Sequence, residues 1–196
     1  MKKIGLTGSI ASGKSLVASV LGELGAVVID TDRVAREVVA ARSQGWNSIV
    51  KEWGEGVLGE DGEIDRKKLA DVVFADDAQR EKLNSILHPL IFRRVAEEVS
   101  RAPGDARVVI VAPLLFESGF DAWMDSVWVV TAPEEALAQR ILERDSCTRE
   151  HALQRIGSQM SQEEKAARAD VVIDNSGKME ETRKRVIEAW RNDEES

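Results

Sequence analysis

The 196-residue chain has one cysteine, two histidines and no apolar run approaching 18 residues. The single cysteine, Cys147, excludes an intramolecular disulfide, and neither histidine stands at metal-ligand spacing from it, so we expect no zinc site. The short apolar runs exclude a transmembrane helix, and the start of the chain lacks the core of a signal peptide. We therefore expect a cytoplasmic protein.

The chain also lacks an excess of positive charge. Its 27 Lys and Arg residues stand against 35 Asp and Glu residues, a formal net charge of −8. Nucleic acids and anionic membranes attract concentrated positive charge, so we expect neither as a partner. Any anionic substrate must be held by a local basic site.

The strongest signal follows the first apolar stretch, where the chain reads Gly8-Ser9-Ile10-Ala11-Ser12-Gly13-Lys14-Ser15. This octapeptide matches the Walker A pattern, in which glycines turn backbone N–H groups toward phosphates, Lys14 neutralises the β/γ oxygens and Ser15 offers its hydroxyl to Mg²⁺. Apolar residues at helical spacing follow it, as a helix after the loop requires. The alternative, a glycine-rich turn without a ligand, does not account for this position between a strand and a helix.

Five short apolar runs rich in β-branched residues alternate with helical patterns. This alternation predicts an α/β fold, a three-layer α/β/α core around a five-stranded parallel sheet. The predicted strands cover residues 3–7, 26–30, 107–112, 126–131 and 170–174. Between the second and third strands we expect a helical insertion, with an N-cap at Asp65, a helix over 76–87 and another opened by Pro89.

Carboxylates follow two of the predicted strands. Asp30 and Asp32 end the second strand, and ligands of such sheets gather at the carboxyl ends of the strands. An aspartate there can orient or deprotonate an accepting hydroxyl, although Asp32 can also serve as the N-cap of a helix over 33–41. Glu117 lies five residues past the third strand, where it either reaches substrate and the metal's water shell or is a surface charge. The aspartate that ATPase motors carry directly after this strand is absent.

Four arginines surround the short loop over 145–148: Arg140, Arg144, Arg149 and Arg155. Arg140 and Arg144 are four residues apart and share one helical face. Such a face can fold over a triphosphate and stabilise the charge of the transferring group, as lid arginines do in kinases. Exposed solvated arginines are the alternative reading.

In order and spacing these motifs resemble the dephospho-CoA kinase family over nearly the whole chain. The matching stretches are 4–15, 28–32 with 35–36, 87–91, 113–117, 140 with 144–145, 155 with 159, and 169–177. The resemblance implies transfer of the ATP γ-phosphoryl group to the ribose 3′-hydroxyl of dephospho-CoA, giving CoA and ADP with Mg²⁺, the last step of CoA synthesis. It also implies a nucleotide-binding core (1–34, 103–138 and 161–196), a helical substrate domain (35–102) and a lid (139–160).

The same resemblance assigns roles to individual residues. Lys14, Asp32 and Arg140 are the expected catalytic residues, and Ser15 is the expected metal ligand. The expected ATP-binding residues are Gly8, Ser9, Ile10, Ala11, Ser12, Gly13, Lys14, Ser15, Arg144, Asn175 and Gly177. The expected acceptor-binding residues are Asp32, Arg36, His88, Leu115 and Glu117. The loop departs from the usual family form at Ser9 and Ala11, where glycine is common, which predicts a stiffer loop.

Two other functions share parts of this pattern. A related P-loop kinase for another small molecule or a nucleotide would keep the core and differ in the acceptor pocket of the insertion. A regulatory GTPase or nucleotide-dependent binding module would need a guanine-selecting Asn-Lys-x-Asp segment, which the chain lacks. We expect a monomer whose partners are ATP and dephospho-CoA.

Overall fold

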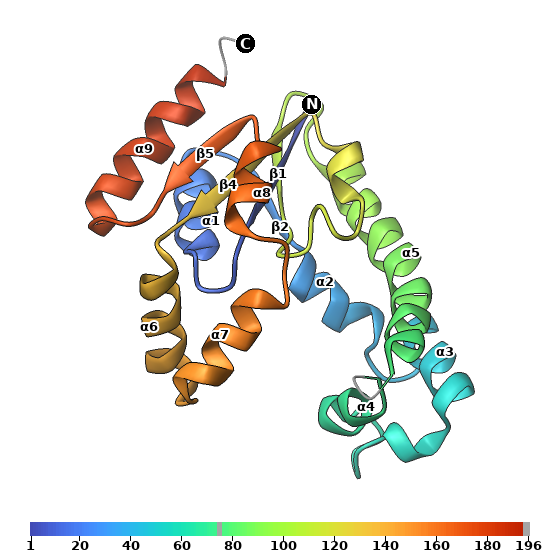
Figure 1. The fold of residues 1–196 in the computed structure, drawn as a ribbon. Helices are drawn as coiled ribbons and strands as arrows, with labels where there is room; N and C mark the ends of the chain where they lie inside the picture. Colours follow the sequence, from blue (N-terminus) through green and yellow to red (C-terminus); the bar gives the residue numbers. More distant parts are fainter. Residues whose placement is uncertain (74–75, 194–196) are drawn as a thin grey trace. The chain divides into compact units, whose positions relative to one another are not determined.

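The computed structural model describes residues 1–73 and 76–193, and the chain divides into two compact units (Figure 1). Unit 1 consists of Met1–Ile29 and Ala102–Ser196, and unit 2 consists of Asp30–Arg101. Unit 2 is therefore an insertion that leaves unit 1 after the second strand and returns before the third.

Unit 1 is built on a five-stranded sheet. β1 pairs in parallel with β3 on one side and with β4 on the other, and β4 pairs in parallel with β5. In order across the sheet, the strands are β2 (Val27–Asp30), β3 (Arg107–Val111), β1 (Lys2–Gly8), β4 (Ser126–Thr131) and β5 (Val171–Asp174). All five predicted strands are present, with bounds within one residue of those expected. The central strand is the one that leads into the Walker A segment.

Helices cover the sheet of unit 1. α1 (Lys14–Glu23) and α9 (Met179–Asn192) lie side by side on one face, where Ile4 and Leu6 of β1 share a core with Leu21 and Trp190 (Figure 1). Because side chains alternate along a strand, Gly5 faces the other side, toward Leu115 and Met124. The remaining helical elements of the unit are η2 (Phe120–Trp123), α6 (Glu134–Asp145), α7 (Arg149–Gly157) and α8 (Gln162–Ala167). The predicted α/β class and parallel sheet are confirmed.

Unit 2 is helical apart from one isolated bridge, Leu58 to Ile64, among its described residues. Its elements are α2 (Thr31–Val38), α3 (Gln44–Trp53), η1 (Glu55–Val57), α4 (Arg66–Val73) and α5 (Asp77–Arg101). Ile49, Leu69 and their neighbours form its small apolar core. Asp65 caps α4 as predicted, because its Oδ1 accepts from the Lys67 and Lys68 amides at 2.9 and 3.1 Å.

The structure corrects two local predictions in unit 2. Pro89 does not open a second helix but lies inside α5, which is continuous over 25 residues. A proline inside a helix costs about 3 kcal/mol, yet both halves of α5 are held by packing, Leu87 against the unit core and Val95 in a buried position. The N-cap of α2 is Asp30, whose side chain accepts from the Asp32 amide at 2.8 Å, so Asp32 stands within the first turn and does not cap the helix.

In the part of the chain that the structure describes, no helix combines the length and the apolar character needed to cross a membrane.

Candidate active site

The Walker A segment forms a tight loop between β1 and α1. Its backbone is left-handed at Ala11 (φ 60°) and Gly13 (φ 102°), and Gly13 immediately precedes the helix. Lys14 arches back over the loop, with Nζ donating to the Gly8 and Ser9 carbonyls at 2.8 and 2.9 Å. No side chain caps the N-terminus of α1, and uncapped first amides beside a lysine ammonium can accept an anion. Ser15 is exposed in the first turn of α1.

Ala11 is one of the two loop positions where the sequence departs from the usual glycine. A left-handed conformation costs a residue with a Cβ about 1 to 2 kcal/mol, so the loop holds Ala11 in this conformation against its own preference. Ser9, the other departure, is buried at 2 % exposure. The loop therefore accommodates both residues, Ala11 at positive φ and Ser9 in a buried position.

Asn175, directly after β5, supports the loop through a side-chain hydrogen bond. Its Nδ2 donates to the Ser12 carbonyl at 2.7 Å, and its Oδ1 accepts from the buried Thr182 hydroxyl at 2.7 Å. The side chain is 6 % exposed, and both of its polar atoms have protein partners. Gly177, also expected in the ATP site, is exposed two residues later in the turn that leads to α9. The structure thus brings Asn175 to the phosphate loop, and sequence reasoning missed Thr182, which gives no motif signal.

Arg140 on α6 also reaches the phosphate loop. Its guanidinium donates to the Ala11 carbonyl at 3.2 Å and to the Asn175 carbonyl at 2.9 Å. Gln159, after α7, accepts from the Ile10 amide at 3.1 Å through Oε1. Two side chains from opposite ends of the predicted lid therefore contact the loop. The resemblance included Gln159 without giving it a role.

Two further arginines of the predicted lid bind a carboxylate at the end of α6. Arg144 makes a bidentate pair with Asp145 at 2.7 and 2.9 Å, and Arg155 from α7 pairs with the same side chain. The hydrogen bond from Arg144, aided by Arg155, holds the pKa of Asp145 well below its usual range. Arg149 pairs with Glu135 instead. In this structure Arg144 and Arg155 are thus fixed to each other through Asp145.

The turn after β3 contains Leu115 and Glu117, the two residues of unit 1 that we expected to bind the acceptor. Leu115 is fully buried and faces the Gly5 position of β1. Glu117 accepts from the Met160 amide at 3.0 Å and pairs with the Lys165 ammonium at 3.1 Å, both through Oε1. Glu117 is therefore not an unpartnered surface charge, and Leu115 belongs to the packed interior of the unit.

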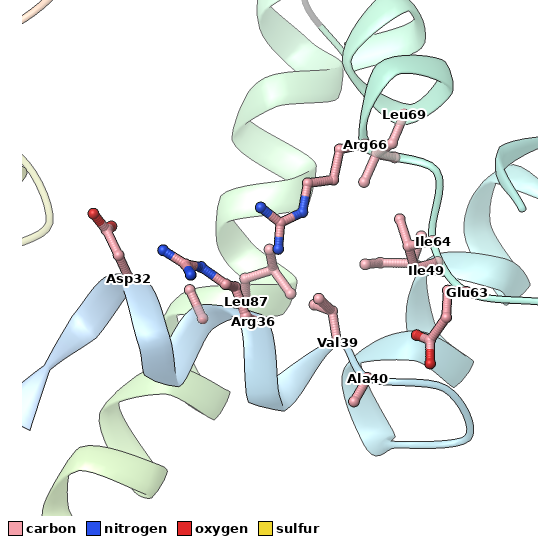
Figure 2. Close-up of a pocket in the computed structure, with 11 residues that line it drawn as sticks. Asp32, Arg36, Val39, Ala40, Ile49, Glu63, Ile64, Arg66, Leu69 and Leu87 are labelled. Carbon is pink, nitrogen blue, oxygen red and sulfur yellow. The ribbon is translucent and has the colours of Figure 1, made fainter. Parts of the chain in front are cut away.

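Unit 2 contains a cavity of about 640 Å³ beside the start of α2 (Figure 2). Asp32 lies at one edge, and the guanidinium groups of Arg36 and Arg66 extend into the same space. Most of the remaining wall is apolar, and the residues that form the rest of it are Ala35, Val39, Ala40, Ile49, Glu63, Ile64, Leu69 and Leu87. Two cations above an apolar wall fit a ligand that carries phosphate groups and a long uncharged arm.

The structure thus brings Asp32 and Arg36 together in one cavity and adds Arg66, which sequence reasoning missed. The only signal at Arg66 was the start of a helix after Asp65. His88 lies on α5 next to Leu87 in the chain but does not line the cavity. His88 is half-buried, and this burial lowers its pKa.

No protein cage for a metal exists among the described residues, because no group of three His, Cys, Asp or Glu side chains lies at ligand distance. Mg²⁺ in nucleotide sites usually takes one or two protein oxygens together with phosphates and water. The exposed hydroxyl of Ser15 at the anion site fits that donor set.

The matching family model and the curated relatives at 41 to 48 % identity name one family. Residues 2–181 match the family model described as dephospho-CoA kinase. The dephospho-CoA kinase of Geobacter sulfurreducens is 48 % identical over 194 residues, which cover 97 % of this chain and 98 % of that protein.

Solved structures share the fold over nearly the full length. TT1252 from Thermus thermophilus gives a TM-score of 0.87 at 35 % identity, covering 98 % of this chain and 97 % of that one. Dephospho-CoA kinase from Campylobacter jejuni gives 0.72 at 29 % identity, covering 97 % and 96 %. By its phosphate loop, its fold and these similarities, the chain belongs to the dephospho-CoA kinase family of phosphotransferases.

Proposed function

We propose that this protein transfers the γ-phosphoryl group of ATP to the ribose 3′-hydroxyl of dephospho-CoA, giving CoA and ADP. The observation that carries this proposal is the cavity beside Asp32, which is lined by two arginines and an apolar wall. This lining fits dephospho-CoA, which has phosphate groups and a long arm, better than it fits a small uncharged alcohol. Family membership gives the reaction class.

ATP is the proposed occupant of the phosphate loop. The backbone amides of the loop and of α1 would hold the β-phosphate, and Lys14 would turn from the Gly8 and Ser9 carbonyls toward the β/γ oxygens. Ser15 would supply the protein ligand of Mg²⁺, which when bound neutralises charge on the β- and γ-phosphates.

Dephospho-CoA is the proposed occupant of the unit 2 cavity. Arg36 and Arg66 would pair with its diphosphate, since guanidinium groups bind phosphate oxygens in bidentate fashion. The apolar wall around Val39 and Leu87 would take part of the pantetheine arm.

Asp32 is the proposed catalytic carboxylate. It would accept a hydrogen bond from the 3′-hydroxyl and take its proton as the oxygen attacks the γ-phosphorus and ADP departs. Arg140 would leave the loop carbonyls and stabilise charge on the transferring group when the lid over 139–160 closes, with Arg144 in the same lid.

We propose that one chain suffices for this cycle, and size-exclusion chromatography with light scattering would test the monomer.

The decisive experiment is an ADP-release assay with Mg·ATP and a panel of acceptors: dephospho-CoA, adenosine, AMP and none. ADP release only with dephospho-CoA, with one phosphate added to it by mass spectrometry, supports the proposal. Release with another acceptor would assign the chain to a kinase of different specificity, and release with none would contradict acceptor phosphorylation altogether.

A further inference from the structure

A lysine is fully buried in unit 1, outside the residues that the proposed mechanism uses. The Lys165 side chain on α8 has 0 % exposure, and its ammonium bonds to Glu117 Oε1 at 3.1 Å and to the Pro113 carbonyl at 3.1 Å. Burying an ammonium carries a large desolvation penalty, and replacing a buried ion pair by apolar side chains is often neutral or stabilising. Stability is therefore a poor account of Lys165, whereas a fixed position for Glu117 follows directly from its geometry.

The helix that carries Lys165 is itself firmly attached. α8 begins with a complete capping box, in which Ser161 and Glu164 each bond to the other's backbone amide. Gln162, the first residue of α8, bonds through its side-chain amide to both the backbone N–H and the carbonyl of Ala132, at 3.0 and 2.8 Å. The start of the helix that carries Lys165 is thus bonded to the residue after β4, and the Lys165 ammonium is bonded to the turn after β3.

Glu117 in turn contacts the end of the predicted lid. Its Oε1 accepts from the Met160 amide at 3.0 Å, while the preceding residue, Gln159, accepts from the Ile10 amide of the phosphate loop. The segment over 158–161, which joins α7 to α8, is therefore held on one side by Glu117 and on the other by the phosphate loop. Any movement of α6 and α7 must use this segment or the connection before α6 as a hinge.

The Pro113 carbonyl links the same lysine to β1. It also accepts from the Thr7 hydroxyl at 3.3 Å, and Thr7 lies directly before the phosphate loop. Lys165 therefore contacts a carbonyl that bonds to Thr7, directly before the loop, and a carboxylate that bonds to Met160.

We propose that Lys165 is a positioning residue for phosphoryl transfer: it holds Glu117 in place, and through Glu117 it fixes the hinge of the lid at Met160. This role presupposes the proposed lid and reaction. Loss of the Lys165 ammonium should therefore lower turnover and loosen the segment at Met160. It should affect ATP binding little, because the contacts of this ammonium are with Glu117 and Pro113 and not with the loop amides or Lys14.

The first test is amide hydrogen exchange on the full-length protein, which does not depend on activity. The variants are Lys165→Met, which keeps the length of the side chain without its charge, Glu117→Gln, the double variant, and Lys184→Met as a control at an exposed lysine of α9. We expect exchange at Met160 to accelerate about tenfold or more in the first three variants and not in the control, with sheet amides unchanged. Unchanged exchange at Met160 in Lys165→Met would overturn the proposal.

The second test measures kcat and both KM values for the same four proteins, with melting temperatures recorded alongside. Lys165→Met should lower kcat about tenfold or more and leave the KM for ATP within about twofold, and the double variant should be no worse than Lys165→Met because both act on one contact. Additive losses, or a loss that follows melting temperature alone, would overturn the proposal. If Lys165→Met does not fold, Glu117→Gln alone decides both tests.

A wild-type protein that phosphorylates nothing would contradict the proposed function, while the exchange test would still judge the role of Lys165.

Discussion

The side-chain amide of Asn175 donates to the Ser12 carbonyl at 2.7 Å, which ties the end of β5 to the phosphate loop across 163 positions of the chain. Thr182 on α9 fixes the other end of the same amide by donating to Oδ1. The loop therefore keeps its shape through a buried hydrogen-bond chain that starts on a helix remote in sequence.

Thr182→Val should weaken this chain by removing the buried hydroxyl. The side-chain Oδ1 of Asn175 then loses its partner, which costs about 1 to 3 kcal/mol in the free energy of unfolding, and we expect the KM for ATP to rise. Denaturant unfolding and steady-state kinetics would measure both effects. Thr182→Ser keeps the hydroxyl and serves as the control; equal losses in the two variants would point to packing of the methyl group instead.

Gly13→Ala should abolish most ATP binding. At this position φ is 102°, and a Cβ would lie 2.0 Å from Asn175 Nδ2, so the new methyl group must displace the amide that braces the loop. Gly25→Ala is a matched control, because φ there is 95° and nothing lies within 4 Å of the Cβ position. Fluorescent ATP-analogue titration should show a loss of about tenfold or more for Gly13→Ala alone. Equal affinities in the two variants would show that the clash is relieved without cost to the loop.

Asp32→Asn should lower kcat by about 100-fold or more and leave ATP binding nearly intact, as expected for a carboxylate that orients and deprotonates the accepting hydroxyl. Single-turnover phosphorylation of dephospho-CoA together with ATP titration would separate the two quantities. Asp71→Asn, at an exposed position of α4 that does not line the cavity, is the control. Turnover at the wild-type level in Asp32→Asn would remove Asp32 from catalysis.

Arg66→Gln should raise the KM for dephospho-CoA about tenfold and leave the KM for ATP unchanged, because a phosphate-binding guanidinium is lost from the cavity. Arg101→Gln, at the exposed end of α5, removes the same charge away from the cavity. An equal rise in both variants would indicate general electrostatic attraction, and no rise in either would place the acceptor phosphates elsewhere.

The carboxyl group of Asp145 should remain ionised below its ordinary pKa of 3.8, since hydrogen bonds from Arg144 and then Arg155 lower that pKa. A carboxyl with a depressed pKa favours the folded state above its unfolded pKa and loses this contribution as pH falls through the folded value. The arginine cluster should therefore survive mild acid. An NMR titration of the Asp145 carboxyl would show it, and Arg144→Gln should move the midpoint upward; an unmoved midpoint would contradict the cause.

Much of unit 1 follows from local sequence. The apolar runs of the five strands and the octapeptide over 8–15 each carry their own signal, because a buried parallel strand needs continuous β-branched residues and a phosphate loop needs glycine before lysine. The N-caps Thr148 of α7 and Ser161 of α8, like Asp65 of α4 in unit 2, act on amides only two or three positions away.

Tertiary contacts decided the rest. The continuation of α5 through Pro89 depends on packing of both halves of the helix, which overrides the local cost of proline. Arg66 joins Arg36 in one cavity because α2 and α4 both pack against α5, and the spacing of the two arginines in the sequence does not predict this.

The sequence by itself determined the phosphate loop and the five strands, because these depend on residues close together in the chain, and it indicated the family through the order and spacing of short local motifs. Only the tertiary structure decided that Asn175 braces Ser12 and that a buried Lys165 holds Glu117, because a buried polar group must be paired and its partner can come from any part of the fold. Partners so distant in the chain leave no local pattern to read.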